Sequence, residues 1–297
     1  MRNAFIDELV SFATTNDRVA LIVGDLGYSV VEPFADRFPE RFINSGVAEQ
    51  NMMGLAAGMA SEGYQVFVYS IANFPTFRCA EQIRNDVDYH KLSVTVVSVG
   101  GGLAYGNMGY SHHAVQDYGL MRMFPNMLIA APGDPMEVRA CMRYLIANQQ
   151  PSYLRLGKSG EQCIHSDVPD IEPGQWLKVL DGDGCRRTLL TTGALLSLAR
   201  DWLAAPAYKG YAIHSMPLWS MASKSMQSKQ IATWNAVVTM EDHLADCGFG
   251  SWLRESLENA PQFMSRVSAQ ALDSKVCGIV GTQNTLNRVG GLSFTPE

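Results

Sequence analysis

Residues 47–63 read VAEQNMMGLAAGMASEG, and YQVFVYS (64–70) follows without a break. The first stretch has apolar residues at helical spacing, and the second is a valine- and aromatic-rich run typical of a strand. The same order recurs in PTFRCAEQIRNDVDY (75–89), which predicts a helix, and LSVTVVSVGGG (92–102), which predicts a strand ending in glycines. Alternating helices and strands of this kind predict an α/β fold, with a mostly parallel sheet covered on both faces.

The pattern extends in both directions from this stretch. Strands are predicted at RVALIVGD (18–25), NMLIAAP (126–132) and PSYLRLG (151–157), with a helix over 134–150. Because the carboxyl ends of parallel strands meet at one edge, ligands are expected to bind there. We therefore expect the loops 24–29, 70–77 and 100–113 to gather at that edge.

A second α/β pattern occupies the rest of the chain. RTLLTTG (187–193), YAIHSMP (211–217) and AVVTMED (236–242) predict strands, with helices near 194–204 and 248–259. Between the two patterns the chain is polar and contains proline, glycine and serine, as linkers do. We predict two domains, each a mostly parallel sheet covered by helices, at 1–160 and 175–297, with a linker at 161–174.

The composition excludes several classes of function. The net charge is −6 and the 23 basic residues are scattered, which argues against a nucleic-acid partner, since phosphate binding needs clustered Lys and Arg. No apolar run approaches the length of a membrane span, so no membrane partner is expected. The six cysteines form no C-x-x-C pair and are interpreted as thiols of a reducing compartment, which predicts a cytoplasmic protein.

The most informative motif is a glutamate at the start of the helix predicted over 47–63. Small residues follow Glu49 at Gly54, Ala56, Ala57 and Gly58, and they let another backbone approach closely. From the residues alone, the ordinary interpretation of Glu49 is a solvated first-turn glutamate favoured by the helix dipole.

The stretch GVAEQNMMGLAAGMA resembles the pyrimidine-binding domain of transketolases and related thiamine-diphosphate enzymes. The resemblance continues in the same order through FPTFRCAEQIRNDV (74–87), SVGGGLAYGNMGYSHHAVQDYGLMR (98–122), PNMLIAAPGDPMEV (125–138) and PSYLRLGK (151–158), so it covers about residues 20–160. LLTTGALL, VVTMEDHLADCGFGS and the glycine-rich end are similar, more weakly, to the family's C-terminal domain. The resemblance thus implies a pyrimidine-binding fold followed by a transketolase C-terminal domain.

The resemblance assigns cofactor contacts to five residues. The glutamate at the position of Glu49 bonds a ring nitrogen of the cofactor's aminopyrimidine and favours the imino tautomer that deprotonates the thiazolium ring, a task that suits a buried carboxyl. Phe74 matches the aromatic that stacks on the pyrimidine. Ile71 and Phe77 match residues that wall the same pocket, and Asp25 matches a loop residue near the thiazolium. Without the resemblance, Ile71 and Phe77 are equally well explained as residues of the hydrophobic core. Asp25 is then explained as a residue that favours a turn.

The resemblance also implies contacts with the substrate. His112 matches a histidine that reaches the substrate oxygens, and histidine suits proton transfer near neutral pH, so His112 joins Glu49 as a catalytic candidate. Further substrate contacts are implied for Ser29, His113 and Lys158. Adjacent side chains on extended backbone point to opposite sides, which ranks His113 below His112. A zinc site on this histidine pair lacks thiolate or carboxylate partners at ligand spacing, and we predict no metal ligand in this chain.

The part of the family's site that holds the diphosphate has no counterpart in the sequence. Gly182-Asp183-Gly184 imitates the start of the metal-diphosphate motif, but the window 209–214 lacks the asparagine that the motif requires. We interpret this segment as a tight turn. The resemblance then implies an obligate N-terminal-type transketolase subunit, which holds the cofactor's diphosphate and Mg²⁺, shares thiamine diphosphate with this chain, and forms a heterotetramer with it.

Three positions where the family contacts its substrate carry other residues in this chain. Met108 stands where an acidic residue is usual, Gly100 where a histidine is usual, and Lys158 where an arginine binds phosphate; lysine offers a point charge without arginine's bidentate fork. The leading hypothesis is transfer of a two-carbon ketol unit from a ketose, or ketose phosphate, to an aldehyde acceptor. Two alternatives stay open: the β-type subunit of a 2-oxoacid dehydrogenase, and a non-catalytic assembly subunit.

Overall fold

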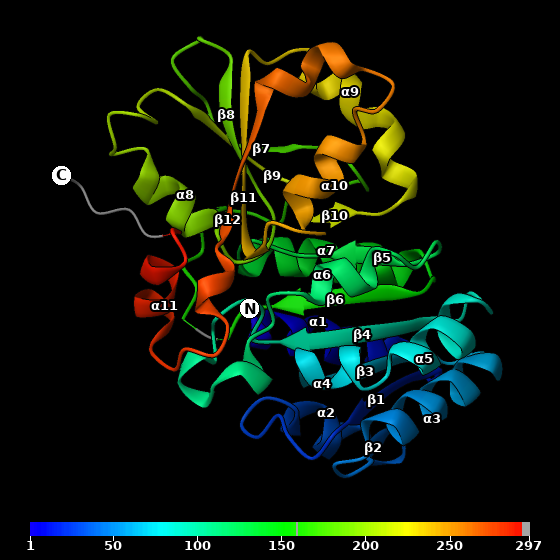
Figure 1. Cartoon of the computed structure of the whole chain (residues 1–297). Helices are drawn as coiled ribbons and strands as arrows, with labels where there is room; N and C mark the ends of the chain where they lie inside the picture. The colour runs from blue at the N-terminus through cyan, green and yellow to red at the C-terminus, as the bar shows by residue number, and fades with distance from the viewer. Residues whose placement is uncertain (159, 293–297) are drawn as a thin grey trace.

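The computed structural model describes residues 1–158 and 160–292, and their strands form two sheets, one standing above the other in Figure 1. The first sheet has the strand order β10-β5-β6-β4-β3-β1-β2, and every pairing is parallel except that of β10 with β5. Its strands are β1 (Val19–Val23), β2 (Phe42–Asn44), β3 (Gln65–Ile71), β4 (Val94–Val99), β5 (Leu128–Ala130), β6 (Ser152–Leu156) and β10 (Leu218–Trp219).

Helices cover both faces of the first sheet. On one face, α1 (Arg2–Thr15) and α7 (Pro135–Ala147) share a hydrophobic cluster with Phe67 and Tyr69 of β3; on the other, α3 (Glu49–Ser61) shares a second cluster with Val66 and Val68. Successive side chains of a strand point to opposite faces, so a strand covered on both sides is apolar at nearly every position. Shorter helices complete the layers: α2 (Glu32–Arg37), α4 (Asn73–Phe77), α5 (Ala80–Gln82) and α6 (Asp117–Met121).

The second sheet has the order β12-β11-β8-β9-β7 and is parallel except where β7 pairs with β9. Its strands are β7 (Leu177–Leu180), β8 (Arg187–Thr191), β9 (Ala212–Ser215), β11 (Ala236–Leu244) and β12 (Val267–Leu272). Its helices are α8 (Leu196–Trp202), α9 (Gln227–Ile231), α10 (Phe249–Glu255) and α11 (Gln283–Val289). The predicted fold class, two mostly parallel sheets covered by helices, is confirmed.

Two details of the predicted organisation differ from the structure. The helix expected over 75–89 is not continuous. Its first part is α4, which starts two residues earlier and ends at Phe77. The helix resumes as α5 and is followed by a π-helical segment, η2 (Ile83–Asp88). A π-helical turn takes up more residues than an α-helical one, and periodicity does not reveal it in advance. In addition, β10 comes from the range predicted for the second domain but pairs with β5 of the first sheet. The boundaries at 160 and 175 stay a prediction.

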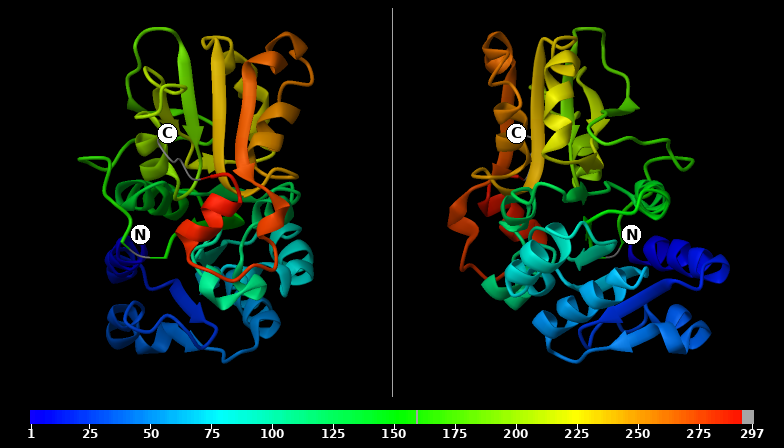
Figure 2. Two further views of the ribbon diagram at one scale, coloured as in Figure 1. Left: turned by 60° about the vertical axis from the view of Figure 1, so that its left-hand side comes forward. Right: turned by 90° about the vertical axis from the view of Figure 1, so that its right-hand side faces the viewer.

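The C-terminal part of the chain folds back onto the first sheet. Helix α11 lies against the short turn η3 (Gly106–Met108), where the Gly281 amide donates to the Gly106 carbonyl at 3.3 Å (Figure 2). The glycine-rich end named above is described only as far as residue 292. In the ranges 1–158 and 160–292, no helix combines the length and the apolar character needed to cross a bilayer.

Candidate active site

Five loops meet at the carboxyl edge of the first sheet. The turn 24–29 follows β1, the segment 45–49 follows β2, and residues 72–78 follow β3. The loop 100–113 follows β4, and Lys158 follows β6. The expected gathering of loops is therefore observed, and it brings most of the predicted site residues to one edge of the sheet.

Glu49 opens α3 and is buried, with 4% of its surface exposed. A Cβ added to Gly24, at the end of β1, would lie 3.8 Å from the Glu49 Cγ, so the two loops are in direct contact. The Arg78 guanidinium donates to Glu49 Oε2 at 2.9 Å. The solvated first-turn glutamate, the ordinary interpretation from the residues alone, is wrong here: the side chain points inward to a charged partner.

Phe74 is linked to Glu49 through Arg78, and it also meets the candidate His112. The Arg78 guanidinium carbon sits 4.4 Å from the centroid of its ring, and the His112 ring meets it edge-on with centroids 5.2 Å apart. A groove of about 500 Å³ runs past Phe74 and Arg78 and is also lined by Phe77 and Tyr110. This groove is the opening through which a planar ligand can reach the Phe74 ring.

His112 lies against the Phe74 ring, next to the groove residue Ser111. Burial, the neighbouring His113 and the Arg78 charge together lower the pKa of His112 below its ordinary value. The neutral imidazole is therefore favoured near pH 7, and a neutral ring can accept a proton. Its Nδ1 lies 3.0 Å from the Ser111 hydroxyl, which leaves the other ring nitrogen for a ligand.

Asp25 and Ser29 lie in the turn after β1, and both adopt positive φ, 55° and 64°. The Asp25 carboxylate accepts hydrogen bonds from the Asn44 amide at 3.0 Å and the Tyr28 hydroxyl at 3.3 Å. Ile71 is the half-buried last residue of β3. The three residues therefore line the same edge as Glu49, and their roles stay predictions.

The structure separates the other two predicted substrate residues from Phe74. His113 is buried, and its Nε2 faces the Gly106 carbonyl at 3.3 Å, whereas His112 is partly exposed and meets the Phe74 ring. The Lys158 ammonium lies 5.2 Å from the centroid of the Tyr105 ring, and that ring lies 6.5 Å from the His112 ring. Tyr105 therefore stands between Lys158 and His112.

The described residues give no sign of a metal site. In the ranges 1–158 and 160–292 no three His, Cys, Asp or Glu side chains come close enough to hold an ion. The predicted turn at 182–184 is confirmed: Asp183 accepts from the Cys185 amide at 2.9 Å, Gly184 has a φ of 85°, and β8 begins three residues later.

Sequence reasoning missed two arginines. Arg78 follows Phe74 by four residues, a spacing that places two helical side chains on one face and was the available signal. Arg155 lies within the buried strand β6, where a charge requires partners.

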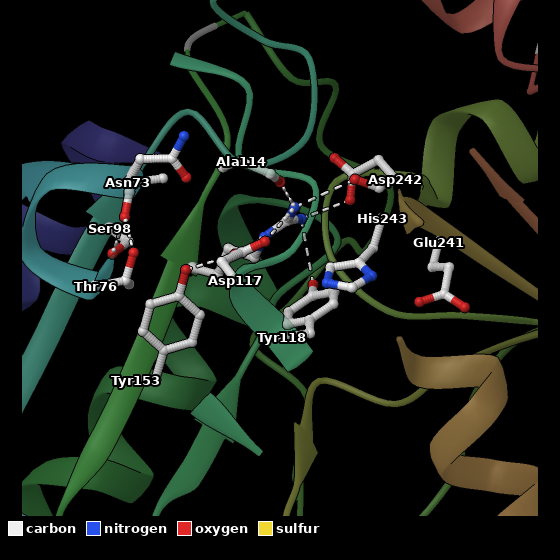
Figure 3. Close-up of polar contacts among 12 residues, drawn as sticks. Asn73, Thr76, Ser98, Ala114, Asp117, Tyr118, Tyr153, Glu241, Asp242 and His243 are labelled. Atoms are coloured by element: carbon white, nitrogen blue, oxygen red, sulfur yellow. Dashed lines mark hydrogen bonds and ion pairs between the residues drawn. The ribbon is translucent and has the colours of Figure 1, made fainter. Parts of the chain in front are cut away.

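The Arg155 side chain is 2% exposed and donates to Asp117 Oδ2 at 2.6 Å and to Asp242 Oδ1 at 2.5 Å. Asp242 belongs to β11 of the second sheet, so these bonds join the two sheets. Figure 3 shows Asp117, Tyr118 and Asp242 gathered at this junction.

Comparisons with known proteins agree with this geometry. The family model described as "Transketolase, pyrimidine binding domain" matches residues 1–160. The chain is 30% identical to the 6-deoxy-6-sulfo-D-fructose transketolase subunit SqwH of a Clostridium species, over 99% of this chain and 90% of that protein. It is 28% identical to one of the subunits of the apulose-4-phosphate transketolase of Phocaeicola vulgatus, over 88% and 84% of the two chains.

Among solved structures, a split-gene transketolase described as an inactive β4 tetramer superposes with a TM-score of 0.82 at 30% identity, covering 98% of this chain and 93% of that one. The chain therefore belongs to the transketolase family, within which it matches the C-terminal subunits of split enzymes.

Proposed function

We propose that this chain is the small subunit of a thiamine-diphosphate-dependent transketolase that moves a two-carbon ketol unit from a ketose to an aldehyde acceptor. The observation that carries the proposal is the buried Glu49 carboxylate beside the Phe74 ring, at the open edge of the first sheet. A purely structural role does not explain a buried carboxylate paired with a half-exposed arginine, because a buried ion pair adds little stability over well-packed apolar residues.

The residues present fit one half of the cofactor. Glu49 would share a proton with a ring nitrogen of the aminopyrimidine, Phe74 would stack on its face, and Ile71 and Phe77 would wall the pocket, with Asp25 near the thiazolium. The fit is supported by Arg78, a planar N–H donor that already meets both the carboxylate and the ring face. When bound, the cofactor supplies the carbon nucleophile and stabilises negative charge on it.

The chain's own contribution to the reaction lies in orientation and proton handling. Glu49 fixes the orientation of the pyrimidine and holds a proton at its ring nitrogen. His112 moves a proton to or from the substrate oxygens, a task for which a lowered pKa suits it near neutral pH. Ser29 would contact the substrate from the turn after β1, and the buried His113 would act only by supporting the loop that carries His112.

A partner chain is part of the proposal. An N-terminal-type subunit would hold the diphosphate and Mg²⁺, giving a heterotetramer in the cytoplasm. The relative from P. vulgatus is named as one subunit of its transketolase, which supports a divided enzyme. Large exposed apolar side chains near the site also support it. Val47, two residues before Glu49, is 74% exposed, and Phe77, which lines the groove, is 47% exposed. Exposed apolar residues next to a site mark interaction surfaces.

Sugars with an anionic end are the substrates that the site favours. The two relatives named above act, by their names, on a sugar phosphate and a sulfonated sugar. Lys158 is exposed on the loop after β6 and offers one positive charge for such a group. Met108 and Gly100 stand in place of the family's usual acidic residue and histidine, and the Tyr105 ring fills the space beside Gly100.

The test replaces Glu49 in the two-chain complex. Glu49→Gln keeps the shape but removes the carboxylate, and we expect turnover to fall about 100- to 10,000-fold, the range of general acid–base contributions. Glu62→Gln, just after the end of the same helix, is the matched control and should keep wild-type turnover. Near-full activity of Glu49→Gln would refute the assigned role. Rapid reduction of a dye acceptor with pyruvate, without ketol transfer, would favour a 2-oxoacid dehydrogenase subunit instead.

A further inference from the structure

Arg78 meets both of the groups that are expected to hold the aminopyrimidine. Its Nη1 donates to Glu49 Oε2 at 2.9 Å, and its guanidinium carbon lies 4.4 Å from the centroid of the Phe74 ring. A guanidinium is flat and cationic and presents N–H donors in its plane. An aminopyrimidine that is protonated at the ring nitrogen and held by the same carboxylate and the same aromatic ring offers the same features, a flat face and an N–H donor.

The two partners of this ion pair differ in how freely they can move. The Glu49 side chain is 4% exposed, whereas that of Arg78 is 50% exposed. Glu49 is fixed in the first turn of α3 against the β1 loop, but Arg78 lies just beyond the C-terminus of the short helix α4 and borders the groove of about 500 Å³. Arg78 can therefore swing into solvent without disturbing the core, and Glu49 cannot.

We propose that Arg78 is a positioning residue that occupies the pyrimidine site of the cofactor-free chain, holding Glu49 and Phe74 in place until the cofactor displaces it. This inference rests on the proposed function. In the exchange, one N–H donor on the carboxylate replaces another, so Glu49 never becomes a buried charge without a partner, a state that is strongly destabilising.

The proposal has a direct consequence for affinity. The cofactor must break the contacts of Arg78 with Glu49 and Phe74 before it can form its own, so these contacts compete with binding. Half-exposed ion pairs are weak, because water and salt screen them. We therefore expect their removal to tighten binding about three- to tenfold rather than by orders of magnitude.

The experiment measures binding of thiamine diphosphate with Mg²⁺ to the complex of this chain and its partner, using calorimetry, so that no turnover is required. Arg78→Met should bind the cofactor three- to tenfold more tightly than wild type, and Arg78→Lys, which keeps the charge but not the planar stack, should fall between them. Arg84→Met, in the same segment and outside the groove of Phe74 and Phe77, is the matched control and should bind like wild type.

A double variant separates competition from a general effect on folding. In a Glu49→Gln background the ion pair is already lost and only the contact of Arg78 with Phe74 remains, so adding Arg78→Met should change affinity by less than it does beside the native Glu49. Equal binding by Arg78→Met overturns the inference, and so does weaker binding, which would instead make Arg78 a group that contacts the bound cofactor. If the wild-type complex binds no thiamine diphosphate, the proposed function itself fails, and the inference fails with it.

Discussion

The buried cluster around Arg155 gives the sharpest prediction for stability. The Arg155 guanidinium donates hydrogen bonds to Asp117 of α6 and Asp242 of β11, and to the Ala114 carbonyl at 2.8 Å. Arg155, Asp117 and Asp242 are all nearly excluded from water. Arg155→Met would therefore leave two buried carboxylates without their cation.

The magnitude follows from the charges. Removing one partner of a buried ion pair costs about 3–5 kcal/mol, and here two carboxylates lose their partner, so we expect Arg155→Met to cost about 5 kcal/mol. Asp242→Asn leaves Arg155 with Asp117 and with a neutral hydrogen-bonding partner, so it should cost only about 1–2 kcal/mol. The double variant should cost less than the sum of the two, because the Asp242 charge is no longer stranded.

Urea unfolding, followed by tryptophan fluorescence and by circular dichroism, measures these differences. Arg143→Met is the matched control: Arg143 pairs with Glu8 at the surface, at 3.1 Å with more than half of its side chain exposed, and should cost below about 1 kcal/mol. A cost for Asp242→Asn as large as that for Arg155→Met, or strictly additive single effects, would refute this account of the cluster.

Three further predictions concern the site and its supports. Phe74→Ala should weaken thiamine diphosphate binding by the two-chain complex at least about fivefold, since aromatic stacking contributes about 1 kcal/mol beyond area burial; unchanged affinity in calorimetry would contradict stacking. Gly100→Ala should cost roughly 2–3 kcal/mol in urea unfolding, because Gly100 has a φ of 82° and its Cβ would overlap the Tyr105 ring; a neutral effect would show that this ring is not fixed. For Asp134, burial raises the pKa, but hydrogen bonds from His165 and backbone amides outweigh it and lower the pKa to about 2. The ionised Asp134 carboxylate therefore contributes about 2 kcal/mol of stability above pH 3.8, and this contribution is lost as pH falls through 2. The loss of unfolding free energy in Asp134→Asn, measured at pH 7, should become smaller below pH 4. A loss that does not depend on pH would contradict this.

Local sequence pattern was enough to predict five of the seven strands of the first sheet, all but β2 and β10. The apolar strands predicted at 18–25, 64–70 and 92–102 are observed as β1, β3 and β4. Each observed strand begins within two residues of its predicted start. Strand identity follows from burial on both faces, and the position of the loops follows from the parallel arrangement. The convergence of Glu49, Phe74 and His112 could therefore be expected before any coordinates were known.

The groups that complete the site could not be predicted in this way. Arg78 and Glu49 are 29 residues apart, and Arg155 and Asp242 are 87 apart. No periodicity links such pairs, because a contact between distant segments depends on how the loops and the two sheets pack. The π-helical segment 83–88 and the short strand β10 were missed for the same reason: tertiary packing, and not local propensity, fixes both.

The two arginine clusters differ in a way that separates scaffold from site. Arg155 and its carboxylate partners Asp117 and Asp242 are all buried within the chain. Their ion pairs therefore serve to hold the two sheets together. At Glu49 the carboxylate is buried while its arginine is half exposed. Stability alone does not explain such a pair, since well-packed apolar residues are often at least as stabilising as a buried charge. A buried carboxylate whose partner is free to leave can instead receive a cation or N–H donor from outside the chain. That asymmetry, rather than the presence of a glutamate at a helix start, is the physical reason to assign the binding site to Glu49.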